Sequence, residues 1–265
     1  MKPKLVIIGA AGRMGKIIAS LAIDADELTI AAAVDTAGHP DLGKDIGTLA
    51  GNKSIGVNLS ASLPDHAAVV IDFSLPDGAQ KTVDFCLNKN AALVMGTTGL
   101  DAAAADKIKQ AAKKIPVIYG TNMSVGMNVL FALVGKAAQM LGPDYDIEII
   151  EQHHRFKKDA PSGSALTLAE KICKDTNRDY PDSLNYGRFG KDALRKSGEI
   201  GIHAVRAGDI TGIHSVIYST LGESVTLNHT AHNRDGFAKG ALRAAAWLVG
   251  KNPGQYTVAD CLGIK

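Results

Sequence analysis

The sequence predicts an α/β protein in which a doubly wound parallel sheet is joined to a second, smaller α+β domain. Three observations support this fold class. A glycine-rich turn joins the first apolar run to a helical pattern, strand and helix patterns alternate up to residue 119, and closely spaced strand patterns without helices fill residues 201–229. We expect the first domain to comprise residues 1–123 and 234–265, and the second domain to comprise residues 124–233.

The first strand, Leu5–Ile8, is followed by the turn Gly9–Gly15 and by an apolar helical segment. Glycine permits a tight turn and a close approach of backbone to phosphate, and the N-terminus of a helix attracts anions. A second apolar run, Leu28–Val34, ends at Asp35, at the spacing where a carboxylate binds the ribose hydroxyls of a dinucleotide. These features predict a Rossmann-like site for NADH or NADPH. Ala11 departs from the commonest fingerprint, and the alternative interpretation is an ordinary strand–turn–helix connection.

The alternation of strands and helices continues through the first domain. Strands are expected at Val69–Phe73, Ala92–Met95 and Pro116–Tyr119, and helices at Asp77–Asn88 and Asp101–Lys114. Ligands of a doubly wound sheet bind beyond the carboxyl ends of its strands. The candidate cofactor-binding residues at these ends are Gly9, Ala10, Ala11, Gly12, Arg13, Met14, Asp35, Gly96, Thr97, Thr98, Gly120, Thr121, Asn122 and Met123. For Gly96–Gly99 the alternative is a plain loop in which Thr98 or Asp101 caps the next helix.

The pattern changes in the second domain. A helix is expected at Val125–Leu141, and a strand follows at Tyr145–Gln152. Three further strands follow one another closely, which predicts a mostly antiparallel sheet; they are Gly201–Arg206, Ile213–Thr220 and Ser224–His229. The last helical pattern, Phe237–Val249, is expected to return to the first domain.

The segment His153–Ser164 combines two histidines, an arginine, two lysines and a Pro-Ser-Gly turn. Clustered cations are unfavourable unless an anion neutralises them. The apolar spacing that follows predicts a helix whose N-cap is Ser162 or Ser164 and whose N–H groups face the cluster. We therefore expect a site for a small substrate that carries carboxylates. The alternatives are a polar strand end for the two histidines and an ordinary solvated lysine for Lys157.

Other polar residues of the second domain are assigned structural roles. Asp159 is expected to organise the segment by accepting N–H bonds, and Arg206 is expected to form a structural turn with Asp209. The remaining histidines lie far apart in the sequence and have no carboxylate or thiolate partners, so we expect no metal site. They include His203, His214, His229 and His232.

The composition argues against several classes of protein. The 29 lysines and arginines nearly balance the 27 acids, and there is no polybasic run, which argues against non-specific binding of nucleic acid. The three cysteines are Cys86, Cys173 and Cys261, and their spacing indicates neither a disulfide framework nor a zinc site. We expect no cleavable leader, because the first thirty residues form the candidate cofactor unit, and no apolar stretch reaches membrane-spanning length. We expect a cytoplasmic enzyme with no membrane or nucleic-acid partner.

The segment His153–Ser164 resembles the signature segment of the 4-hydroxy-tetrahydrodipicolinate reductases, formerly called dihydrodipicolinate reductases. Other segments resemble that family in the same order along the whole chain; they are Gly9–Gly15, Ile71–Ser74, Gly96–Gly99, Asn122–Gly126, Val205–Ile210 and Arg234–Gly240. The resemblance implies a homotetrameric, NAD(P)H-dependent enzyme of the diaminopimelate route to lysine. Such an enzyme reduces 4-hydroxy-tetrahydrodipicolinate, by way of its dehydrated cyclic imine, to tetrahydrodipicolinate.

The resemblance also implies residue roles. His153 takes the acid/base position and Lys157 that of the proton donor, whereas the substrate carboxylates are held by His154, Ser162, Gly163 and Ser164. Relatives that favour NADPH often carry an arginine where this chain has Thr36, so we expect NADH to serve at least as well as NADPH. Arg13 or Lys16 could compensate.

Two other functions remain open from the sequence. The first is another oxidoreductase of the same two-domain plan, such as a semialdehyde or sugar dehydrogenase. An acylating dehydrogenase needs a nucleophilic cysteine at a strand end or helix start, whereas the three cysteines of this chain lie within or beyond helical patterns. The second is a non-catalytic protein that senses dinucleotides, which would have no need of Lys157 beside paired histidines.

Overall fold

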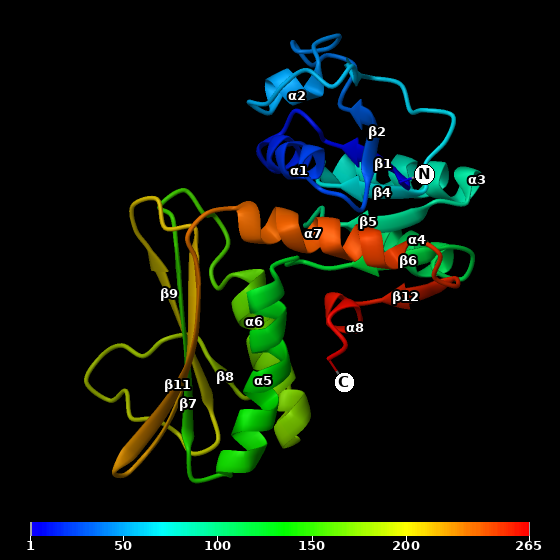
Figure 1. Cartoon of the computed structure of the whole chain (residues 1–265). Helices are drawn as coiled ribbons and strands as arrows, with labels where there is room; N and C mark the ends of the chain where they lie inside the picture. Colours follow the sequence, from blue (N-terminus) through cyan, green and yellow to red (C-terminus); the bar gives the residue numbers. More distant parts are fainter. Residues whose placement is uncertain (1, 265) are drawn as a thin grey trace. The chain divides into compact units, whose positions relative to one another are not determined.

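A computed structural model describes residues 2–264 of the chain, which form two compact units (Figure 1). The first unit contains the residues up to Val125 together with those from Arg234 onward, and the second contains Gly126–Asn233. Among the described residues, no helix combines the length and the apolar character needed to cross a membrane.

A parallel seven-stranded sheet forms the centre of the first unit, and this confirms the predicted fold class. Its strands are β1 (Lys4–Ile8), β2 (Thr29–Val34), β3 (Leu59–Ser60), β4 (Val69–Asp72), β5 (Ala92–Met95), β6 (Pro116–Tyr119) and β12 (Gly254–Tyr256). They are arranged in the order β12-β6-β5-β4-β1-β2-β3. The direction of winding therefore reverses between β1 and β4, and ligands of such sheets bind at this switch point.

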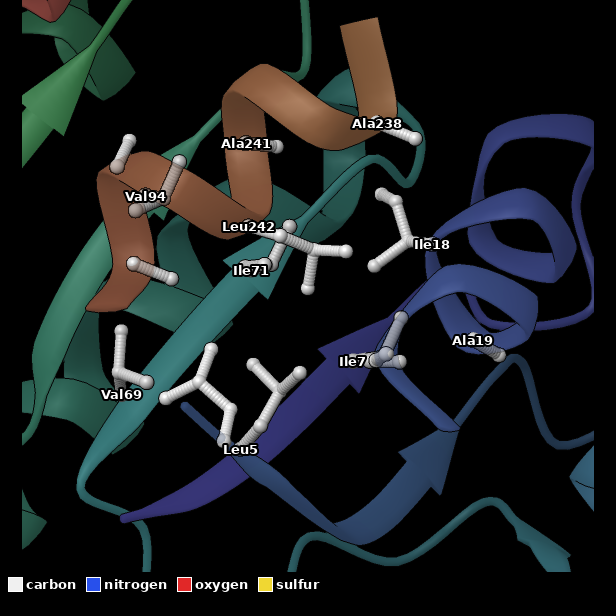
Figure 2. Close-up of a cluster of buried hydrophobic side chains, with 14 of the residues drawn as sticks. Leu5, Ile7, Ile18, Ala19, Val69, Ile71, Val94, Ala238, Ala241 and Leu242 are labelled. Atoms are coloured by element: carbon white, nitrogen blue, oxygen red, sulfur yellow. The ribbon is translucent and has the colours of Figure 1, made fainter. Parts of the chain in front are cut away.

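Helices cover both faces of the sheet because its strands are apolar on both sides. The helices of this unit are α1 (Arg13–Ile23), α2 (Ile46–Leu49), α3 (Ala79–Lys89), α4 (Ala102–Ala111), α7 (Asp235–Leu248) and α8 (Val258–Cys261), with a 3₁₀ turn at Pro76–Gly78. Leu5 and Ile7 of β1 pack against α1 and α7, whereas Val6 packs on the face covered by α3 and α4. Figure 2 shows the first of these layers, in which Ile18 of α1 and Leu242 of α7 lie against the strands. Helix α7 therefore belongs to the first unit.

The second unit contains a mixed five-stranded sheet. Its strands are β7 (Asp146–His153), β8 (Leu184–Asn185), β9 (Ile200–Arg206), β10 (Gly212–Thr220) and β11 (Glu223–Ala231), in the order β11-β10-β7-β9-β8. β10 is antiparallel to β7 and β11, but β9 is parallel to β7 and β8. The antiparallel expectation is therefore correct for β10 and β11, but wrong for β9, which pairs in parallel with β7. Helix α6 (Gly163–Thr176) lies between β7 and β9 in the chain, and such a crossover connects parallel strands.

One face of this second sheet packs against α5 (Val125–Leu141) and α6, as Figure 1 shows. Ile147, Ile149 and Val216 alternate with outward-facing residues and meet Leu168 of α6 in the core. Tyr218 is fully buried on the same face, and its hydroxyl donates to the carbonyl of Val134 in α5 over 2.6 Å. The helices thereby fix β7, the strand that carries the histidine pair at its end.

Candidate active site

The glycine turn after β1 brings α1 unusually close to the strand ends. Gly9 has a φ of +73°, and a Cβ there would lie 2.8 Å from the carbonyl oxygen of Phe73. A Cβ on Gly15 would lie 2.2 Å from the carbonyl oxygen of Gly9. The amides of Gly9 and Ala10 both donate to the carbonyl of Val34. Only residues without a Cβ allow this close approach of helix and turn.

The N-terminus of α1 suits an anionic group. Its N-cap, Gly12, provides no side-chain hydrogen bond to the first turn, and both Gly12 and Arg13 are exposed. Asp35 lies beside the turn, where Oδ2 accepts from the amide of Ala11 and Oδ1 from the amide of Thr36, each over 2.9 Å. A carboxylate has about four acceptor sites, so Asp35 keeps capacity for hydroxyl groups. The residues present therefore fit a dinucleotide.

The other strand ends of the first unit are tied to one another. Thr97 Oγ1 donates to Oδ1 of the buried Asp72 over 2.9 Å, and the ring of Phe73 lies on Gly96, where a Cβ would be 2.4 Å from the ring. Asp101 caps α4 by accepting from the amide of Ala104, so the helix-cap alternative for the loop after β5 applies to Asp101 rather than to Thr98. Thr98 is exposed.

Some of the candidate cofactor-binding residues after β6 are exposed, and others are buried. Thr121 is exposed and Gly120 is half-buried. Asn122 Oδ1 accepts from the amide of Ser124 over 2.9 Å. The side chain of Met123 is buried in the core next to α7, which leaves its backbone as the part able to face a ligand.

In the second unit, His153 lies at the end of β7 beside a fully buried carboxylate. Its Nδ1 is 2.5 Å from Oε2 of Glu151. Arg206, the last residue of β9, donates from Nη1 to Oε2 and from Nη2 to Oε1 of Glu151, over 2.9 and 2.7 Å. The expectation that Arg206 forms a turn with Asp209 is therefore wrong for Arg206, because strand pairing places it opposite His153 and beside Glu151; Asp209 lies in the turn that follows β9.

Lys157 follows in the loop after β7. Its ammonium forms an ion pair with Oδ1 of Asp159 at 2.8 Å, and its amide donates to the carbonyl of His154. Arg206 Nη2 also donates to the carbonyl of Asp159 over 2.6 Å. Asp159 therefore helps to organise the loop, and its carboxylate accepts from the Lys157 ammonium as well as from a backbone N–H.

Ser162 is the N-cap of α6, which confirms one of the two predicted caps. Its Oγ accepts from the amide of Ala165, and its own amide donates to Glu151 Oε1. Ser162 Oγ also lies 3.3 Å from Nε2 of His214, so this hydroxyl is engaged inside the protein. Gly163 and Ser164 form the first turn of the helix, at the positive end of its dipole.

The electrostatics of this cluster follow from burial and pairing. Burial alone raises the pKa of Glu151, but hydrogen bonds from His153, Arg206 and the Ser162 amide outweigh it and bring that pKa to about 2. Burial lowers the pKa of His214 to about 3. The cluster thus contains an ionised glutamate, Glu151, and a neutral buried histidine, His214.

Glu151 and His214 are not identified as site residues from the sequence, although strand alternation could have identified Glu151. Residues 149, 151 and 153 share one face of β7, so Glu151 must be buried next to His153. His214 is 52 residues from Ser162, and no local pattern joins them.

The described residues contain no group of three or more histidine, cysteine or acidic side chains arranged to hold a metal ion. Burial raises the pKa of Cys86, Cys173 and Cys261, so none of these thiols has the character of a nucleophile.

The buried His214 makes stability depend on pH. In the unfolded chain His214 binds a proton near pH 6.5, but in the folded protein it does so only near pH 3. The free energy of unfolding therefore falls as pH falls through this window. In a His214→Gln variant, we expect the slope of unfolding free energy against pH to decrease by about 1.4 kcal/mol per pH unit between about pH 6 and 4. Urea unfolding followed by circular dichroism measures it. An exposed control, His232→Gln, should keep the wild-type slope, and an unchanged slope in His214→Gln would contradict the assignment.

Comparison with known proteins adds independent findings. Residues 3–123 match the family model described as dihydrodipicolinate reductase, N-terminus, and residues 126–262 match the model described as dihydrodipicolinate reductase, C-terminus. The chain is 45% identical to the 4-hydroxy-tetrahydrodipicolinate reductase of Anaeromyxobacter dehalogenans (strain 2CP-C), over 99% of this chain and 98% of that protein. It is 40% identical to the enzyme of the same name from Syntrophus aciditrophicus (strain SB), over 99% of both chains.

Solved structures share the fold. A dipicolinate-bound dihydrodipicolinate reductase from Paenisporosarcina sp. TG-14 has a TM-score of 0.75 at 23% identity, with 98% of this chain and 99% of that chain covered. A myo-inositol dehydrogenase from Corynebacterium glutamicum ATCC 13032 has a TM-score of 0.62 at 16% identity, with 96% and 90% covered.

Proposed function

The chain belongs to the 4-hydroxy-tetrahydrodipicolinate reductases, so it is an NAD(P)H-dependent oxidoreductase of the diaminopimelate route to lysine, and we propose that His153 and Lys157 carry out its acid–base chemistry. The reaction converts 4-hydroxy-tetrahydrodipicolinate, by way of its dehydrated cyclic imine, to tetrahydrodipicolinate. One observation supports the residue assignment above all: His153, held against a buried glutamate, and Lys157 frame the same loop that leads into the capped N-terminus of α6.

The first unit is proposed to bind the dinucleotide, which supplies a hydride when bound. The amides at the start of α1 would hold the pyrophosphate at the positive end of the helix dipole, and the turn Gly9–Met14, whose glycines permit a close approach, would lie against it. Asp35 would accept from the ribose hydroxyls. The segments Gly96–Thr98 and Gly120–Met123, at neighbouring strand ends, would contact the nicotinamide half.

The second unit is proposed to bind the substrate. His154, Gly163 and Ser164 would hold its carboxylates, and Ser162 would shape this pocket through its cap. Reduction at ring carbon 4 places electron density on the ring nitrogen and carbon 3. The ammonium of Lys157 stabilises that density and donates a proton, and His153 exchanges protons with the same region.

NADH is proposed to serve at least as well as NADPH. The carboxylate of Asp35 repels a 2′-phosphate, and the neighbouring Thr36 is exposed and uncharged. Arg13 and Lys16 are the cations at the start of α1, and a measurable reaction with NADPH would point to them.

A homotetramer is proposed to assemble through the face of the second sheet that does not meet α5 and α6. Ile150, Ile213 and Ile217 are only half-buried on that face. Phe189 and Leu194, in the loop before β9, are also strongly exposed. Three buried free thiols suit a reducing compartment, which supports a cytoplasmic location.

The decisive experiment generates the unstable substrate in place with dihydrodipicolinate synthase and follows the loss of NADH or NADPH absorbance after this protein is added. We expect rapid loss that requires the cyclic imine, with a rate for NADH no lower than for NADPH. Absence of loss with both cofactors, from a folded protein that binds dinucleotide, would overturn the proposed function. A much faster rate with NADPH would overturn the argument from Asp35 and Thr36 alone.

A further inference from the structure

We propose that Glu151 is a positioning residue that fixes His153 in the tautomer protonated on Nδ1, and that it leaves Nε2 as the nitrogen that exchanges protons with the substrate. This inference rests on the proposed role of His153 and names the group that prepares it. Glu151 lies two residues before His153 in β7, and strand alternation places both on the same face.

Glu151 can act only as an acceptor in its surroundings. Its side chain is fully buried, and each carboxylate oxygen accepts from Arg206. Oε1 accepts in addition from the amide of Ser162 over 3.0 Å, and Oε2 faces His153 Nδ1. A buried carboxylate that is paired with an arginine fork and surrounded by N–H donors remains ionised.

The tautomer of His153 follows from that charge. An ionised carboxylate has no proton to give, so the contact between Oε2 and Nδ1 requires the proton to be on Nδ1. In a neutral imidazole the other nitrogen, Nε2, then carries a lone pair. This is the arrangement in which a carboxylate behind a histidine sets the ring orientation and the reactive nitrogen.

Nε2 lies beside a residue that has no side chain. The ring edge that bears Nε2 faces Gly212 at the start of β10, and a Cβ on Gly212 would lie 3.3 Å from Nε2. The His153 side chain keeps 12% of its surface exposed, whereas Glu151 keeps none. The ring of His153 thus keeps part of its surface accessible, while its Nδ1 is held by a fully buried carboxylate.

The same carboxylate joins the pieces of the site. Through its contacts it connects β7, which carries His153, to the amide of the α6 cap Ser162. Arg206 extends this connection to the carbonyl of Asp159, whose side chain holds Lys157. A single buried charge therefore orients the proposed base and anchors both ends of the loop that carries the proposed proton donor.

The test is Glu151→Gln, which keeps the size of the side chain and removes its charge. If the amide oxygen stays with Arg206 Nη2 and the Ser162 amide, the NH₂ group faces Nδ1 and forces the proton onto Nε2. We expect kcat to fall by at least about 10²-fold, since a carboxylate-to-amide change behind a catalytic histidine imposes the wrong tautomer. KM should change much less, because the proposed carboxylate ligands keep their places.

The same strand provides a matched control. Glu148 also contacts a histidine, His203, at 2.6 Å and also accepts from an arginine, Arg188, over 2.8 Å. It lies on the opposite face of β7 from His153. Glu148→Gln removes the same charge from the same strand and should leave kcat and KM close to those of the wild type.

Long-range ¹H–¹⁵N spectra of the histidine rings read the tautomer directly, with the His153 signals assigned by their loss in His153→Asn. We expect Nδ1–H in the wild type and Nε2–H in Glu151→Gln. If Glu151→Gln fails to fold, the wild-type spectrum alone decides the proposal. Nε2–H in the wild type, or a Glu151→Gln variant with wild-type kcat, would overturn it. A wild type without reductase activity would overturn the proposed function instead, while the spectra would still report the tautomer.

Discussion

A Lys157→Met variant is expected to turn over the cyclic imine about 10³-fold more slowly than the wild type while it binds the dinucleotide with the same affinity. The substitution keeps an unbranched apolar stem and removes the ammonium that pairs with Asp159. In the proposed mechanism that ammonium both donates a proton and stabilises the electron density that develops on the ring. Its loss therefore acts on the chemical step, and steady-state kcat with substrate generated in place measures it.

The adjacent lysine provides the control for Lys157→Met. Lys158 is exposed, whereas Lys157 is half-buried against Asp159. Lys158→Met removes the same charge from the same loop and should keep kcat near the wild-type value. Equal losses in both variants would mean that the loop acts through its overall charge, and would contradict a specific role for Lys157. Dinucleotide binding, followed by titration calorimetry, should be unchanged in both.

The elements that the sequence predicts well are those with a clear period and clear ends. The buried strands of the first unit are continuous apolar runs, and α4 begins where Asp101 can cap it. The glycine turn is predictable because only glycine tolerates the contacts at Gly9 and Gly15. These features depend on neighbouring residues, and the sequence contains them directly.

The short elements depend on contacts that no period reveals. Helix α2 has four residues and is held by Asp45, which caps it at Thr48 and also accepts from the amides of Ile55, Gly56 and Val57. Such an arrangement follows from one side chain binding a distant loop. Strand β3, with two residues, is likewise defined by pairing with β2 rather than by its own composition.

The candidate site divides in the same way. His153, Lys157 and the Ser162 cap lie within one short segment, so the sequence predicts them together. Arg206 is 55 residues from Glu151, and only the parallel pairing of β7 with β9 brings them together. The sequence pattern predicted antiparallel neighbours for these strands, and that register would not have revealed the partner of Glu151.

A Gly15→Ala variant is expected to lose at least about 10²-fold in dinucleotide affinity, as a displacement of about 1 Å in a positioned group can cost that much. Alanine normally favours a helix over glycine by about 1 kcal/mol. At Gly15, however, a Cβ would lie 2.2 Å from the carbonyl oxygen of Gly9 and 2.5 Å from Cα of Ala10. Both obstacles are backbone atoms that cannot rotate away, so α1 must move off the turn. The movement displaces the amides proposed to hold the pyrophosphate.

Gly236→Ala separates this collision from the general effect of adding a methyl group to a helix. Gly236 lies in the first turn of α7, in the same unit, and a Cβ there would meet only Ser124 Oγ at 3.9 Å, an ordinary contact. Helix propensity then acts alone, and this variant should be as stable as the wild type or slightly more so. Gly15→Ala should instead lose about 1–3 kcal/mol of unfolding free energy in urea, together with its affinity for NADH. Wild-type binding of NADH by Gly15→Ala would show that α1 can shift without disturbing the ligand, and the turn would then not be the pyrophosphate site.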